Sequence, residues 1–150
     1  MKMKISRLGI SPKVLEEKNV SFYYDEKEKS TTVTVTYRIQ YPYYFYSEST
    51  QKKIREYIFS LSSSITQSNC GVEGYVTFMT KFKTVCADGD TFDKKIGRDR
   101  ALDKSRRFAY KVSKEIYSIV KEDLTKRIKF FDDAITKLDT NIRYINNKEK

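Results

Sequence analysis

The chain has 150 residues, a formal net charge of +10 and no histidine. This length is typical of a single domain, and the missing histidine excludes a Ser-His-Asp or Cys-His catalytic set. The positive excess predicts an anionic partner such as a nucleic acid or a nucleotide. We therefore expect a binding protein and not an enzyme, with no catalytic residues, no bound metal and no cofactor.

The N-terminal part of the chain is predicted to contain a short helix followed by a β-hairpin. A Ser-Pro pair within residues 1–18 is typical of a capped first helical turn. Apolar and polar residues then alternate over 20–24, and again over the β-branched segment 32–40. The polar stretch 25–30 between them predicts a turn, so the two segments form a hairpin with one buried face.

The middle of the chain is predicted to hold a helix and a further strand. Pro42 makes 41–46 an edge strand or a loop. Apolar residues at helical spacing predict a helix over 50–65, capped by Ser49 or Thr50. Asn and Gly residues within 69–74 indicate a break, and 75–85 alternates as a third strand.

A long helical region follows, with Thr91 as its expected cap. From there to Asn146 the only glycine is Gly97 and there is no proline. A heptad seam runs along its second half at spacings of 4, 3, 4, 3, 4, 3, formed by Leu124, Ile128, Phe131, Ile135, Leu138, Ile142 and Ile145. One long bent helix, or two helices joined near 121–123, fits this pattern. We favour a seam between two copies of the chain, and an intramolecular helical hairpin is the alternative.

These elements predict an α+β fold, in which an antiparallel sheet of three or four strands is covered by helices, with a long C-terminal helix or helical hairpin. Residues 1–120 would form the core domain and 121–147 the C-terminal helix, an oligomerisation element, before a frayed tail at 148–150. No stretch reaches the roughly 18–20 apolar residues of a membrane span, so we expect no membrane partner and a cytoplasmic location. Cys70 and Cys86 are expected to be free thiols, and a disulfide across a sheet edge is the alternative.

Two faces of the helix after Thr91 carry distinct residue types. Small residues recur every fourth position at Gly97, Ala101, Ser105 and Ala109, which predicts close approach of the helix to the sheet. Beside them runs a basic stripe, and the N–H groups at the helix start favour phosphate. The predicted phosphate-binding residues are Lys94, Arg98, Arg100, Lys104, Arg107 and Lys111. The alternative is a solvated face, partly neutralised by neighbouring acids such as Asp99 and Asp103.

Aromatic residues near these cations could stack on a base. Bases stack on aromatic side chains for about 1–3 kcal/mol each, and the candidates here are Phe92, Tyr43, Tyr44 and Tyr46. For the tyrosines, burial in a strand is the alternative role. Asp88, Asp90 and Asp93 lack the remainder of a calcium-binding loop, so they are expected to cap the helix.

The segment 73–110 resembles a pattern in small phage and prophage proteins, the type one Thoeris anti-defence proteins. The resemblance rests on a strand ending in Cys, a D-x-F-D turn and a G-R-x-x-A helix, at Cys86, Asp90, Phe92, Asp93, Gly97, Arg98 and Ala101. Members of that family are oligomeric proteins of β-sheet and helices that sequester cyclic nucleotide immune signals without cleaving them. The resemblance implies the same role for this chain, in the cytoplasm of the host cell.

A weaker resemblance points to a different partner. The run Lys94 to Arg98 is similar to the basic helix start with which double-stranded-RNA-binding domains grip phosphates. It implies the alternative function of a basic nucleic-acid-binding protein that recognises the backbone of duplex RNA or DNA. An inhibitor that binds a host protein complex is a further alternative.

Overall fold

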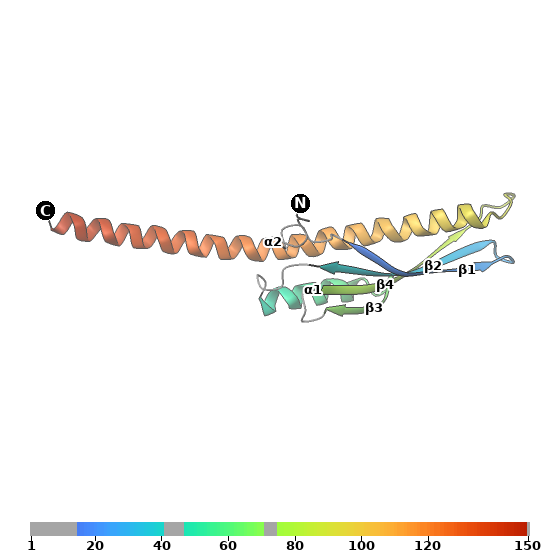
Figure 1. Ribbon diagram of the computed structural model, residues 1–150, viewed down its shortest axis with the longest axis horizontal. Helices are drawn as coiled ribbons and strands as arrows, with labels where there is room; N and C mark the ends of the chain where they lie inside the picture. The colour runs from blue at the N-terminus through green and yellow to red at the C-terminus, as the bar shows by residue number, and fades with distance from the viewer. Residues whose placement is uncertain (1–14, 41–46, 71–74, 150) are drawn as a thin grey trace, which may run out of the picture.

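The computed structural model describes residues 15–40, 47–70 and 75–149. In chain order the elements are β1 (Glu16–Asp25), β2 (Ser30–Gln40), α1 (Glu48–Ser60), β3 (Ile65–Cys70), β4 (Tyr75–Val85) and α2 (Lys94–Lys148). The four strands form one sheet in the order β1-β2-β4-β3, and each neighbouring pair is antiparallel. The predicted α+β fold, with an antiparallel sheet and a long C-terminal helix, is therefore confirmed (Figure 1).

The predicted hairpin is formed by β1 and β2. Its turn is stabilised by Asp25, whose Oδ1 accepts hydrogen bonds of 3.0 Å from the backbone N–H groups of Lys27 and Glu28. Lys29 closes the turn with a φ of +51°, in the left-handed region. Along β2, alternate residues face the core, because successive side chains point to opposite faces of a sheet. Its buried hydrophobic residues are Val33, Val35, Tyr37 and Ile39.

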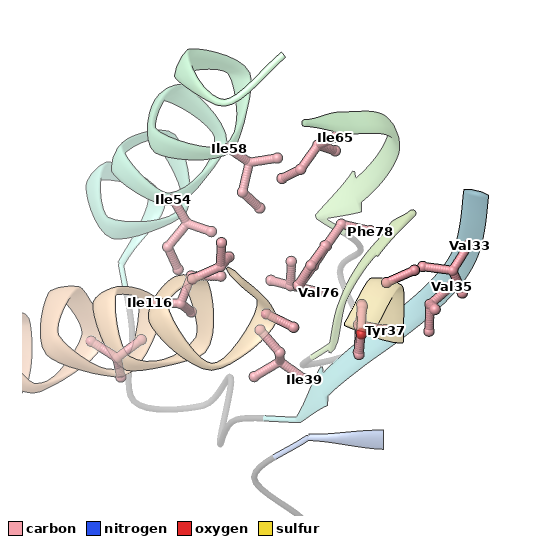
Figure 2. Packing of buried hydrophobic residues seen from close by; sticks show 14 residues of the cluster. Val33, Val35, Tyr37, Ile39, Ile54, Ile58, Ile65, Val76, Phe78 and Ile116 are labelled. Carbon is pink, nitrogen blue, oxygen red and sulfur yellow. The ribbon is translucent and has the colours of Figure 1, made fainter. Parts of the chain in front are cut away.

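Both helices cover the same face of the sheet, so the molecule has one core between two layers. The first half of α2 lies over β2 and β4, and α1 packs beside α2 near β3. Figure 2 shows Ile54 and Ile58 of α1, Ile116 of α2 and Phe78 of β4 pointing into one shared cluster. The second half of α2 extends beyond the sheet (Figure 1).

The small residues of α2 bring it into close contact with the sheet, as their spacing predicts. Ala101, Ser105 and Ala109 are fully buried. The Ser105 hydroxyl lies 2.6 Å from the hydroxyl of Tyr37 and 2.9 Å from that of Thr80. Burial raises the pKa of Tyr37 to about 12, which the hydrogen bond to Ser105 partly opposes. The tyrosine is therefore neutral at pH 7, and this buried polar cluster fixes α2 over the two central strands.

An ion pair at the margin of the core joins α2 to the first strand. Arg106 donates from Nε and Nη2 to the two carboxylate oxygens of Glu17, at 2.6 and 3.1 Å. The hydrogen bond to Glu17 raises the pKa of Arg106 further above its usual value. This two-point contact fixes the rotation of α2 about its axis, because a fork of parallel bonds tolerates little twist.

Several sequence predictions differ from the structure at particular residues. Glu16 to Lys18 belong to β1 and not to an N-terminal helix. Helix α1 is capped by Ser47, whose hydroxyl accepts from the N–H of Thr50, and it ends at Ser60 and not at 65. Residues 65–70 form β3, which the sequence prediction missed because this short polar strand buries only Ile65 fully. The single helix over Lys94–Lys148 also rules out the helical hairpin.

Other expectations concern the thiols, the membrane and the segment 41–46. Cys70 and Cys86 are both free and half-buried, as expected. Within the described ranges, no helix is long and apolar enough to cross a membrane. The predicted edge strand or loop at 41–46 lies outside the described residues.

Candidate functional site

A pocket of about 240 Å³ lies at the end of the molecule where α2 begins. Its walls come from the start of α2, the connection 86–93, the end of β4 and the residues that lead into β2. Val85, Phe92 and Ile96 are among its apolar lining residues. Its polar lining includes Lys29, Thr31, Asp90 and Arg100. The pocket thus combines an aromatic ring, two cations and acceptor groups.

The connection between β4 and α2 is tied to the β1–β2 turn, which shapes one wall of the pocket. The backbone N–H of Cys86 donates to the carbonyl oxygen of Lys29 at 2.8 Å. The Lys29 ammonium donates in turn to the carbonyl oxygen of Asp90 at 3.2 Å. The Cys86 thiol lies 3.7 Å from the carbonyl oxygens of Asp90 and Thr91. An ammonium has three N–H donors, so Lys29 keeps donor capacity for a ligand.

The start of α2 is capped by Asp93 and not by Thr91. The Asp93 carboxylate accepts from the backbone N–H groups of Lys95 and Ile96, at 2.8 and 3.2 Å. The cap already uses two of the N–H groups that the sequence analysis expected to favour phosphate at this helix start. A phosphate at this end of the molecule would therefore depend mainly on side chains such as Arg100.

Gly97 and Thr31 form the closest contact between α2 and the sheet near the pocket. A Cβ atom on Gly97 would lie 2.2 Å from the Thr31 Oγ1 and 3.1 Å from the Thr31 Cβ. The Thr31 side chain is fully buried, and its hydroxyl has no hydrogen-bond partner among the residues described. An unpaired buried hydroxyl costs about 1–3 kcal/mol, so the close packing of α2 on the sheet at this point carries that penalty.

The Gly97→Ala variant is expected to lower the free energy of unfolding by about 1–3 kcal/mol, because overpacking at a helix–sheet contact is destabilising. This loss should exceed the gain of about 1 kcal/mol that alanine brings to a helix interior. Urea unfolding measures the change. Adding Thr31→Ala removes the clashing oxygen, so the double variant should recover most of the lost unfolding free energy. A single Gly97→Ala variant more stable than the parent would contradict this account.

The predicted binding residues divide between the pocket and the outer side of α2. Phe92 and Arg100 line the pocket. Lys104 follows one turn later, and its ammonium donates to the carbonyl oxygen of Lys83 at 3.3 Å. Arg107 and Lys111 continue along the same exposed side of the helix, beyond the pocket.

Two predicted cations are not among the residues that line the pocket, and three predicted aromatic residues fall outside the described ranges. Lys94 pairs with Glu26 at 3.5 Å, and its ammonium lies 5.1 Å from the centre of the Tyr24 ring. Arg98 precedes Arg100 by two residues and so points about 200° away around the helix. Tyr43, Tyr44 and Tyr46 lie outside the described residues.

Sequence reasoning missed the pocket residues that come from the strands. Lys29 and Thr31 lie more than sixty positions before Phe92 in the chain, and they reach the pocket only because β2 pairs with β4. The register places Ser30 opposite Val85, so the start of β2 meets the end of β4. A lysine in a polar turn does not by itself predict a binding role, so Lys29 could not be identified from the sequence.

Comparisons with known protein families, with curated proteins and with solved structures find no match to this chain. Within the part of the chain that the structure describes, no three His, Cys, Asp or Glu side chains are grouped to hold a metal ion. The pocket at the start of α2 therefore provides the basis for a functional assignment.

Proposed function

We propose that this chain is a non-enzymatic, phage-type anti-defence protein that sequesters a phosphate-bearing nucleotide, such as a cyclic nucleotide signal. The observation that carries the proposal is the pocket itself, in which the Phe92 ring, the Arg100 guanidinium and the Lys29 ammonium come from separate parts of the chain to line the same space. The resemblance of 73–110 to anti-defence proteins points the same way.

The mixed lining of the pocket suits a nucleotide better than it suits a bare phosphate ion. Phe92 and Ile96 offer apolar surface to a base, and Arg100 offers a charged fork to a phosphate. Asp90 would repel a free anion, but a carboxylate accepts hydrogen bonds from ribose hydroxyls or from an amino group of a base. The pocket is smaller than the roughly 300–1,000 Å³ of sites that enclose a drug-sized ligand. It would take the base, with the phosphates outside near Arg100 and Lys104.

The role we propose is capture without chemical change. The chain has no histidine, the commonest general acid or base at neutral pH. A protein that acts by capture must match its ligand in number, so tight binding and slow release matter more than turnover. Both cysteines are free, which supports a cytoplasmic site of action, where thiols stay reduced.

We also propose that the chain acts as a homo-oligomer joined through the second half of α2. From 121 to 149 no side chain is buried, and six of the seven seam residues are exposed by more than half. Leu124, at the start of the seam, is partly buried against the core. An apolar stripe of this length on a projecting helix is typical of a protein interface.

Native mass spectrometry of protein purified from cells, followed by heat release and identification of small molecules, tests nucleotide capture. We expect an intact phosphate-bearing nucleotide to be recovered. The emptied protein should then show a raised melting temperature with that compound and no shift with inorganic phosphate. A panel of cyclic dinucleotides, cyclic trinucleotides and cyclic ADP-ribose isomers extends the search. If no member binds and none is recovered, the chain is not a nucleotide-binding protein.

The exposed basic side of α2 favours a second candidate function, binding of nucleic acid. Arg100, Lys104, Arg107, Lys111 and Lys114 are exposed along about 21 Å of helix, at 1.5 Å per residue. Such a protein would bind duplex RNA or DNA with an affinity that falls steeply with salt. Gel shifts at two salt concentrations separate this function from nucleotide capture.

A further inference from the structure

From Ile128 onwards, the apolar side chains of α2 pack against no other element among the described residues. The last fully buried side chain of α2 is Val120, and the helix continues from there to Lys148. Ile128 and Phe131 are 61% and 63% exposed, and Ile145 near the end is 53% exposed. Most helical stability in proteins comes from the packing of an apolar face, and this part of α2 exposes its apolar face. The projecting half therefore needs a second surface.

The identity of the seam residues selects the geometry of that surface. In heptad notation, position a is isoleucine at Ile128, Ile135 and Ile142. Position d is filled by Leu124, Phe131, Leu138 and Ile145. Among parallel coiled coils, β-branched residues at a combined with leucine at d favour two strands. Two of the four d positions follow that rule, and every a position does.

We propose that a second copy of this chain covers the seam as a parallel, in-register, two-stranded coiled coil over 124–145. This deepens the oligomer proposed above and names its orientation and its contacts. Charge complementarity supports a second copy in this orientation. Arg127 at position g would lie beside Asp132 of the partner subunit at the following position e, twice by symmetry.

Arg127 already makes one ion pair within the single chain. Its Nε lies 3.2 Å from the Asp123 Oδ2, four residues earlier on the same helix. A guanidinium has five N–H donors in a planar fork, so Arg127 can keep Asp123 and still donate to Asp132 of the partner subunit.

An antiparallel pair would bring like charges together. In that arrangement position e faces position e of the other helix, and the charged residues at e are Asp132 and Asp139. The register with the largest overlap would place Asp132 beside Asp139 of the partner subunit, and like charges so placed destabilise the pairing. The sequence of the seam thus disfavours the antiparallel alternative.

On the N-terminal side of Leu124, where α2 reaches the sheet, lysines replace the apolar residues of the heptad pattern. Continued towards the N-terminus, the heptad places Lys121 and Lys114 at position a, and both are exposed. Two copies of each would repel across a coiled coil, so the helices should separate before the sheet domains. The parallel arrangement would then place both pockets at the same end of the dimer.

The oligomeric state of matched variants tests the interface. The parent should have twice the chain mass of 17.7 kDa in native mass spectrometry and light scattering. Phe131→Asp places a charge in the seam and should yield a monomer at the same protein concentration. Phe130→Asp, one residue away at 69% exposure and outside the seam, should stay a dimer. A monomeric parent, or equal behaviour of the two variants, would overturn the interface.

An engineered cysteine tests the orientation separately. In the full chain with Ile145→Cys, a parallel pair places the two new thiols against each other, and oxidation should link position 145 to itself. Peptide mapping identifies this link, so Cys70 and Cys86 can remain. Adding Ile128→Cys gives an antiparallel pair the chance to link 128 to 145. That product in place of the 145–145 link would overturn the parallel arrangement while leaving nucleotide capture untouched.

Discussion

The Arg100→Glu variant is expected to bind the captured nucleotide about 10- to 100-fold more weakly than the parent. A hydrogen bond to a charged group contributes about 1.5–3 kcal/mol, and 1.4 kcal/mol corresponds to a tenfold change in affinity. Arg100 is the cation of α2 that lines the pocket described above. Its side chain is exposed, so reversal of its charge should leave the fold intact. Titration calorimetry with the recovered nucleotide measures the effect.

Arg107→Glu is the matched control for that variant. It makes the same change in charge on the same exposed side of α2, two turns beyond the pocket. If the pocket holds the ligand, Arg107→Glu should leave nucleotide affinity nearly unchanged. Equal losses in the two variants would instead assign binding to the whole basic stripe, as expected for a nucleic-acid-binding protein, and would contradict the pocket.

The Tyr37→Ala variant is expected to lose about 3–5 kcal/mol of unfolding free energy, the usual cost of truncating a large buried aromatic side chain. Tyr37 is fully buried, its ring centre lies 5.5 Å from that of Phe78, and its hydroxyl contacts Ser105. The residue therefore contributes both to the core and to the attachment of α2. Urea unfolding followed by circular dichroism measures the loss.

Two further tyrosine variants separate the contributions. Tyr37→Phe keeps the ring and removes only the hydroxyl, so we expect a loss of about 1 kcal/mol, with Ser105 retaining its contact with Thr80. Tyr23→Ala, on the same sheet but 67% exposed, should change stability by less than about 0.5 kcal/mol. A Tyr37→Phe variant that fails to fold would contradict this view of the core. A Tyr37→Ala variant with the same unfolding free energy as Tyr23→Ala would contradict it too.

Periodicity in the sequence was sufficient for the elements whose residues alternate strongly or repeat over many turns. The hairpin of β1 and β2, the strand β4 and the helix α2 were predicted because each has a long apolar face. The strand β3 was missed because it pairs with β4 through its backbone, and a backbone contact leaves no pattern in short polar sequences. The strand β3 belongs to the sheet because its backbone pairs with the free edge of β4.

The sequence by itself determined the fold class, the excess of positive charge and the two faces of α2. The tertiary structure decided which surface each face of α2 meets. Apolar residues up to Val120 pack on the sheet, whereas those from Ile128 onwards are exposed. The structure alone brought Lys29 and Thr31 to Phe92 and Arg100. Strand pairing joins residues far apart in the chain, and such contacts are not encoded in local spacing.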